Sequence, residues 1–98
     1  MESPWKAMAD DSRRQILLLL KKKNMTPTEI LSHFDFTLPA LSTHLKILKN
    51  CDLVTEKKLG KNRIYSLNHN KTFEMMKFFS QMHGYSLSSL KEFLENEK

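Results

Sequence analysis

The sequence has only one cysteine, two glycines and three prolines among its 98 residues. A single cysteine, Cys51, excludes an internal disulfide and suits a reducing cytoplasm. So few glycines and prolines argue against an all-β protein, which needs many turns. They also leave little for phosphate-cradling or substrate-binding loops, and no paired carboxylates or Ser/His/Asp or Cys/His spacing stand out. We therefore do not expect an enzyme.

Long apolar runs are missing as well. The longest covers residues 16–20, whereas a membrane-spanning helix needs about 20 residues. The first residues lack the cationic start and apolar stretch of a secretion signal. With 40% hydrophobic and 28% charged residues the composition is that of a globular protein. We expect one cytoplasmic domain over residues 1–98, with no membrane insertion.

Charge is distributed unevenly along the chain. Residues 1–69 hold twelve basic and seven acidic side chains, which accounts for the whole net charge of +5, whereas residues 70–98 hold four of each. A basic body with a neutral tail predicts a polyanion as the partner of the first part and a different role for the second. Mildly basic domains are also common in the cytosol, so charge alone does not decide the function.

Helix start and stop signals divide the first half of the chain. Ser3-Pro4 predicts a short first helix, and residues 10–12 predict a second that ends at Lys21–Lys23. Cations are stabilising near the C-terminus of a helix, where the helix dipole is negative. This basic triplet is therefore explained by its position and is not counted as a DNA-binding site. Thr26-Pro27-Thr28-Glu29 has the form of a capping box and predicts a short helix through Phe34. A turn of about three residues and a cap at Thr37 then predict a helix over residues 38–50, which makes a helix-turn-helix.

The helix over residues 38–50 has two contrasting faces. Leu38, Leu41, Leu45 and Leu48 cluster on one face and are expected in the core. The opposite face is small, polar and basic and holds no acid: Pro39, Ser42, Thr43, Lys46, Lys49 and Asn50. Small hydroxyl side chains allow close approach to base edges, and lysines reach phosphates.

Two short strands follow, over residues 53–59 and 63–67, with a break at residues 60–62. This pattern predicts a hairpin. Its tip and flanks carry Lys57, Lys58, Lys61 and Arg63 against only Glu56. Lysines on edge strands can also serve to discourage aggregation. Beside the acid-free helix, however, the basic hairpin favours a winged helix, a mainly α fold of order α-α-α-α-β-β-α.

From Asn70 the pattern becomes helical and strongly apolar. Phe73, Met76, Phe79 and Met82 recur every three residues, and Met75 widens the stripe. One small domain cannot easily cover so broad a stripe, which predicts a dimer interface over residues 70–98. The alternative is packing within the monomer. Ser86 could cap a further segment through Leu94, and whether the tail is one kinked helix or two stays open.

The chain resembles the ArsR (arsenic-repressor) family of winged-helix transcription regulators. The resemblance covers about residues 4–69, and its motifs are Trp5–Leu17, Pro39–Leu48, Asp52-Leu53-Val54, Gly60-Lys61 and Tyr65-Ser66-Leu67. It implies a homodimer whose first and last helices form the interface, which adds Trp5 and Met8 to Phe73, Met76, Phe79 and Met82. It also implies a repressor that binds a palindromic operator of double-stranded DNA and leaves it on a signal.

Within that resemblance the residues expected to bind DNA come from the helix and the hairpin. They are Pro39, Ala40, Ser42, Thr43, His44, Lys46, Lys49, Lys58, Lys61, Asn62 and Arg63. His44 lies at the border between the leucine face and the polar face, so it could instead be a half-buried histidine bonded to backbone. Cys51 is interpreted as a small buried hydrophobic residue, with a redox switch as the alternative. Asp52 is expected to adopt a left-handed turn.

Many members of the family sense metals, and the sequence departs from their sites. Thr26 and Thr28 replace a Cys-x-Cys pair, and hydroxyls do not replace thiolates as soft ligands. A second family site falls near His69, Lys71, Met82 and Tyr85, and lysine and tyrosine are poor ligands for divalent ions. We therefore expect no metal and no cofactor, as in the metal-independent autorepressor branch of the family. A metal- or redox-responsive repressor, a winged helix that binds only protein, and an unidentified protein or small-molecule inducer remain alternatives.

Overall fold

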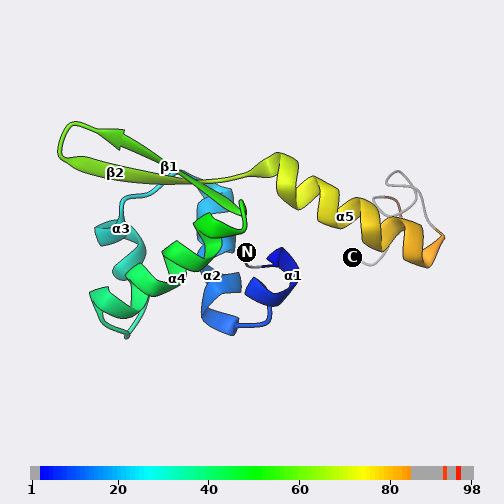
Figure 1. The fold of residues 1–98 in the computed structure, drawn as a ribbon, viewed down its shortest axis with the longest axis horizontal. Helices are drawn as coiled ribbons and strands as arrows, with labels where there is room; N and C mark the ends of the chain where they lie inside the picture. Colours follow the sequence, from blue (N-terminus) through cyan, green and yellow to red (C-terminus); the bar gives the residue numbers. More distant parts are fainter. Residues whose placement is uncertain (1–2, 85–91, 93–94, 96–98) are drawn as a thin grey trace. The chain divides into compact units, whose positions relative to one another are not determined.

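The computed structural model describes residues 3–84 together with residues 92 and 95. These residues form five helices and one two-stranded antiparallel hairpin in the order that the sequence predicts (Figure 1). In chain order the elements are α1 Pro4–Ala7, α2 Asp11–Lys22, α3 Pro27–Leu31, α4 Leu38–Asn50, β1 Val54–Leu59, β2 Asn62–Leu67 and α5 His69–His83. The chain divides into two compact units, Met1–Asn68 and His69–Lys98. The predicted segment from Ser86 to Leu94 lies outside the described residues, Glu92 apart.

The predicted caps are present at three helix starts. Asp10, Thr26 and Thr37 each accept a hydrogen bond from the backbone N–H three residues on, at 3.1, 3.3 and 3.3 Å. Glu29 completes the capping box, since its Oε1 accepts from the Thr26 backbone N–H at 3.1 Å. These bonds satisfy amides that a helix leaves without partners, so short local patterns set where α2, α3 and α4 begin.

Helix α3 is shorter than predicted. It ends at Leu31, so Phe34 lies beyond it and six residues, 32–37, join it to α4 instead of about three. The Ser32 hydroxyl donates to the Glu29 carbonyl at 2.6 Å, which competes with the helical bonding pattern. Phe34 then stacks on Phe36 within the loop, with ring centroids 4.6 Å apart.

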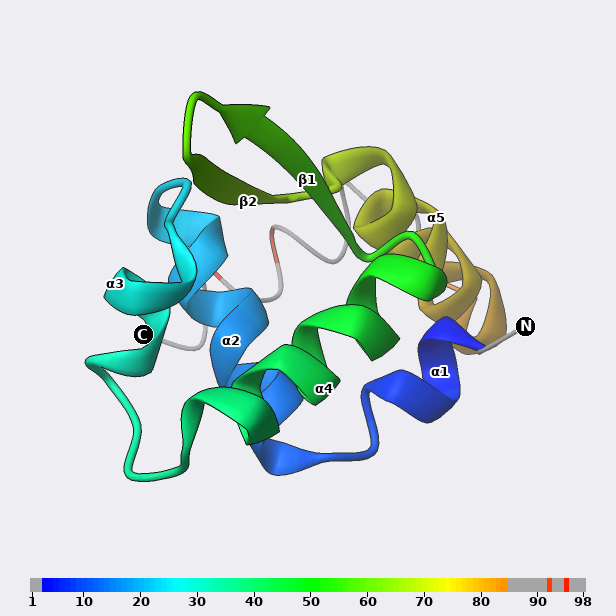
Figure 2. The ribbon, with the colours of Figure 1, turned by 60° about the vertical axis from the view of Figure 1, so that its left-hand side comes forward.

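Helix α4 supplies the centre of the core. It lies across α2 (Figure 2), and Leu41, Leu45 and Leu48 are buried, as predicted. The prediction for Leu38 is wrong, because this residue is 50% exposed. Leu38 is the first residue of α4 and lines a groove between α4 and the hairpin.

The hairpin has the predicted turn with boundaries shifted by one residue. Leu53 precedes β1, and Asn62 belongs to β2 and not to the turn. Gly60 adopts a φ of 61° in the tight reversal, and Asp52 has a φ of 63°, the left-handed turn predicted for it. The base of the hairpin is also fixed from its other side. Met25 and Tyr65 exchange two backbone hydrogen bonds, at 3.1 and 2.8 Å, so the segment before α3 pairs with β2.

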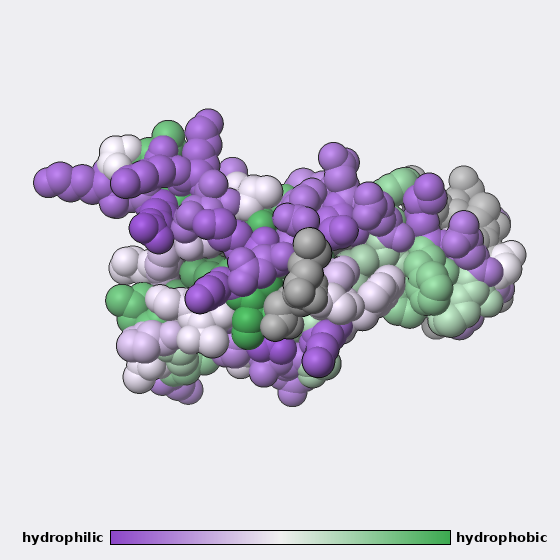
Figure 3. Space-filling model, viewed as in Figure 1, coloured by the Kyte–Doolittle hydropathy of each residue, from purple (hydrophilic) through white to green (hydrophobic). Residues whose placement is uncertain are grey.

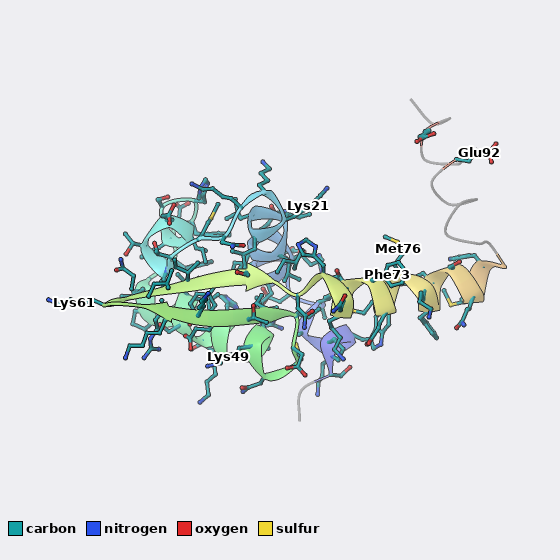
Figure 4. The ribbon with its side chains drawn as sticks, turned by 90° about the horizontal axis from the view of Figure 1, so that it is seen from above. Lys21, Lys49, Lys61, Phe73, Met76 and Glu92 are labelled. Carbon is teal, nitrogen blue, oxygen red and sulfur yellow. The ribbon has the colours of Figure 1, made fainter. Side chains whose placement is uncertain are left out.

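In the second unit, α5 exposes a set of large apolar side chains, referred to below as the α5 surface. It comprises Phe73, Met76, Phe78, Phe79 and Met82, each 47–58% exposed. Pale green atoms mark α5 in Figure 3, and Phe73 and Met76 project from the same side of the helix in Figure 4. Met75 was expected to widen this set but is buried. None of the described helices is long and apolar enough to cross a bilayer.

Candidate nucleic-acid interface

The outward face of α4 is exposed along its length. Ser42, Thr43, Lys46 and Lys49 are exposed, as is Pro39, while Ala40 is half-buried. The Thr43 hydroxyl donates to the Pro39 carbonyl at 3.1 Å, which leaves its oxygen free to accept a hydrogen bond from a base. No acidic side chain of α4 itself stands on this face, so it favours an anionic partner.

The hairpin adds cations at its tip and along its strands. Lys58 of β1 lies directly opposite Arg63 of β2, and Lys61 occupies the turn (Figure 4). Hydrophilic side chains cover this part of the molecule in Figure 3. Like charges directly opposite one another destabilise a strand pair. A bound anion would reduce this repulsion, so the arrangement favours a hairpin that binds an anion.

A groove of about 530 Å³ separates α4 from the hairpin. Its α4 wall holds Ser42, Lys46 and Lys49, and its hairpin wall holds Arg63. Leu38 and Pro27 stand at its edge, and Glu56 and Tyr65 also line it. The fold thus brings four of the predicted DNA-binding residues into one groove that combines small hydroxyl and cationic side chains.

Glu56 is a member of this groove that the sequence did not single out. Its carboxylate accepts from the Lys49 Nζ at 2.9 Å and from the Tyr65 hydroxyl at 2.5 Å, and the Arg63 guanidinium lies 3.6 Å away. The Tyr65 hydrogen bond, followed by that from Lys49, lowers the pKa of Glu56. Burial, with the adjacent Glu56, raises the pKa of Tyr65 to about 12. The carboxylate therefore stays charged and the phenol stays protonated near neutral pH.

His44 lies apart from the groove. It is half-buried and packs against Phe36 with ring centroids 5.4 Å apart. Its Nδ1 is buried and has no hydrogen-bond partner among the described residues. The half-buried position of His44 is as predicted, but its Nδ1 does not make a hydrogen bond to the backbone of any described residue.

Two of the positions named above for metal or redox chemistry, Thr26 and Cys51, have structural roles. Thr26 caps α3, and Thr28 is exposed within it. Cys51 is buried at the end of α4, with its Sγ 3.4 Å from the Leu48 carbonyl, which confirms its prediction as a small buried residue. Of the second set, His69, Lys71 and Met82 belong to α5, and Tyr85 lies outside the described residues. Within the described part of the chain no three His, Cys, Asp or Glu side chains gather as metal ligands would.

Comparison with known proteins identifies the family of this winged helix. Residues 10–56 match the arsR family of bacterial regulatory proteins. The chain is 41% identical over 68 residues to the transcriptional repressor SdpR of Bacillus subtilis (strain 168), which covers 69% of this chain and 76% of SdpR. The protein belongs to the ArsR family. It is accordingly a DNA-binding transcription regulator of the winged-helix class and not an enzyme.

Other known proteins extend the comparison. The arsenical resistance operon repressor of Staphylococcus xylosus is 42% identical over 64 residues, which cover 65% of this chain but only 62% of that repressor. The solved structure of HlyU from Vibrio cholerae N16961 has a TM-score of 0.67 at 29% identity, over 80% of this chain and 85% of HlyU. An ArsR-family regulator designated RHA00566 has a TM-score of 0.74 at 22% identity, which shows the shared fold.

Proposed function

We propose that this ArsR-family protein is a repressor that binds a two-fold symmetric operator as a homodimer and controls its own promoter. The observation that carries the proposal is the groove between α4 and the hairpin, where Ser42, Lys46, Lys49 and Arg63 gather. The names of SdpR and of the arsenical resistance repressor support repression. HlyU of Vibrio cholerae is named an activator, so the direction of regulation needs a direct test.

Helix α4 is the element proposed to enter the major groove. Ser42 and Thr43 are exposed hydroxyls near its middle and would read base edges, with His44 at the border of the contact. Pro39 and Ala40 are small enough at the helix start to let the DNA backbone come close. Lys46 and Lys49 stand further along the same face and would bind phosphates.

The hairpin is proposed to follow the neighbouring DNA backbone or minor groove. Lys58, Lys61, Asn62 and Arg63 are exposed on its strands and turn. Side chains at such a tip reach phosphates without displacing any part of the core, because the tip packs against none of it. The wing would thereby add sequence-independent affinity to what α4 recognises.

A second copy of the chain is the proposed partner of the α5 surface. Phe73, Met76, Phe79 and Met82 are exposed on α5. Trp5 of α1 is exposed as well, and Met8, directly after α1, is half-buried. We propose that residues 70–98 form the dimerisation part of one winged-helix domain over residues 1–98. A two-fold dimer places its α4 helices in half-sites about 10–11 base pairs apart, or a multiple of that distance.

In vitro selection of bound duplexes, followed by footprinting on the protein's own promoter, tests the proposal. We expect a palindromic consensus, protection of that promoter, and affinity that falls with a log–log slope of about −0.9 per neutralised phosphate. Affinity for every duplex that stays flat between low and physiological salt would contradict it. Changing Ser42, Thr43 and Lys46 together should abolish regulation. Regulation that survives this change would instead favour a winged helix that binds only protein.

A further inference from the structure

The groove between α4 and the hairpin already contains an anion of the protein itself. Three cationic side chains line it, Lys46, Lys49 and Arg63, together with the carboxylate of Glu56. Lys49 lies 2.9 Å from one oxygen of Glu56, and Arg63 lies 3.6 Å from the other. Two of the three cations are therefore paired inside the protein, and no ion pair joins Lys46 to any described residue.

Glu56 is held in place more firmly than the cations that it pairs with. Its side chain is 17% exposed, compared with 52% for Lys49 and 61% for Arg63. It lies directly across the hairpin from Tyr65, whose hydroxyl donates to it at 2.5 Å. Tyr65 is in turn bound through its backbone to Met25. The carboxylate cannot swing away into solvent without losing these contacts, whereas both cations can turn toward a ligand.

A DNA phosphate in this groove would lie close to both the cations and the Glu56 carboxylate. Lys49 and Arg63 can bind it only by sharing or leaving the carboxylate, and the carboxylate repels it at short range. Exposed ion pairs are worth little, so the exchange is possible, but it reduces the gain from each phosphate contact. Counterion release is reduced too, because a lysine or arginine that stays paired with Glu56 neutralises no phosphate and so displaces none of the cations condensed on the DNA.

We propose that Glu56 is a built-in competitor of DNA phosphate for Lys49 and Arg63, and that it limits the sequence-independent affinity of the protein. Non-specific binding comes essentially from phosphate contacts, so such a residue acts on every duplex and not on one sequence. The inference rests on the proposed function, since it requires that α4 and the hairpin bind DNA. It adds the acidic Glu56 to the mainly basic and polar residues that are proposed to control DNA binding.

Glu56→Gln tests the proposal, because the amide keeps the shape of the side chain and removes its charge. The probe is a 30-base-pair duplex of scrambled sequence, titrated with the full chain at several salt concentrations. We expect the affinity at about 0.1 M salt to rise fivefold to tenfold, and the log–log slope to steepen by about 0.9 for one further phosphate. An unchanged slope, or a loss of affinity, would overturn the proposal.

Asp11→Asn is the matched control, because it changes the net charge by the same amount elsewhere. Asp11 is exposed, is the first residue of α2, and pairs with Arg14. Helix α2 begins at the end of this unit that lies away from the hairpin (Figure 1). An equal gain in this variant would show that only net charge matters. Tyr65→Phe removes the hydroxyl but keeps the carboxylate, so we expect affinity within about twofold of the unaltered protein. A gain in Tyr65→Phe equal to that in Glu56→Gln would assign the effect to loosened structure and overturn the proposal.

Two further comparisons test the competition, and the first of them does not depend on the folding of Glu56→Gln. Lys49→Met should cost less affinity for the scrambled duplex than Lys46→Met, because Lys49 is already paired and Lys46 is not. Equal losses of affinity in Lys49→Met and Lys46→Met would contradict the proposed competition between Glu56 and DNA phosphate. In a Lys49→Met, Arg63→Met background, Glu56→Gln should no longer raise affinity. If the unaltered protein binds no duplex in a salt-dependent way, the proposed function fails. If it binds but Glu56→Gln behaves like Asp11→Asn, only this inference fails.

Discussion

The α4–hairpin surface and the α5 surface expose side chains of opposite character. The first, formed by the outward residues of α4 and the cations of the hairpin, is polar and cationic and hydrates well without a partner. The second exposes three phenylalanines and two methionines of α5, each about half accessible. Exposed apolar area is unfavourable in water by about 25 cal/mol per Å². One surface is therefore ready for a polyanion, and the other for an apolar partner.

The largest expected effect comes from placing charge on the α5 surface. Phe73→Glu combined with Met76→Glu would bury two carboxylates in the proposed interface. We expect the dimer dissociation constant to rise by about 100-fold or more, because an unpaired buried charge is strongly unfavourable. Sedimentation equilibrium measures it. Lys77→Glu makes the same total change in charge on an exposed polar position of α5 and should leave the dimer intact; a dimer that survives both changes would place the interface elsewhere.

A smaller but still large effect is expected from the cations of the α4–hairpin surface. Changing Lys46, Lys58 and Lys61 to Met should lower affinity for a scrambled duplex on the order of 100-fold at 0.1 M salt and flatten the log–log slope by about 2.7, for three phosphates. The matched control changes Lys21–Lys23 to Met. These residues end α2, where Lys23 pairs with Glu29, and we expect the slope to stay the same. Equal losses of affinity in the two variants would mean that DNA binding depends only on the net charge of the protein.

A modest effect concerns the pH dependence of stability at the α4–hairpin surface. The hydrogen bond from Tyr65, and then that from Lys49, hold the pKa of Glu56 below its usual 4.5. A lowered folded-state pKa stabilises the fold above the unfolded value, and this contribution is lost as pH falls below about 4.5 and through the folded value. We expect less than about 1 kcal/mol from this partly exposed group. Urea unfolding at pH 6 and pH 3.5 should show a smaller pH dependence in Glu56→Gln than in the unaltered protein.

The smallest expected effect is that of metal. Addition of zinc in stoichiometric excess should leave the affinity for the selected operator unchanged, because threonines occupy the positions of the family's thiolate pair. Thr26 uses its hydroxyl as the cap of α3. Fluorescence anisotropy with and without a chelator measures the difference. A metal-dependent change in affinity would restore the metal-responsive alternative.

The features that depend on local sequence were predictable. Asp10, Thr26 and Thr37 mark helix starts because a cap needs only the backbone three residues on. The spacing of Leu41, Leu45 and Leu48 follows from the helical repeat alone. The winged-helix order and the polar face of α4 could therefore be predicted from the sequence.

The features that depend on contacts between elements were not predictable. Glu56 reads as one acid in a basic strand, and only the packing of the hairpin beside α4 brings it to Lys49. Leu38 satisfies the helical repeat, but the core does not extend as far as the first residue of α4. Met75 shares the apolar pattern of α5 and is nevertheless buried among exposed neighbours. Periodicity shows which residues share a face and cannot show where a neighbouring element ends.

The backbone pairing of Met25 with Tyr65 makes the base of the hairpin more rigid than its tip. Near its base, β2 is bonded to β1 on one side and to the segment before α3 on the other, so the base belongs to the rigid body of the unit. Beyond Tyr65 the strands continue only as a two-stranded ribbon toward Lys61. Isolated ribbons of this kind are marginally stable in water. The base of the hairpin is therefore held firmly, whereas its tip can bend. In the proposed complex with DNA, the tip would adjust to the DNA backbone while the base keeps its place beside α4.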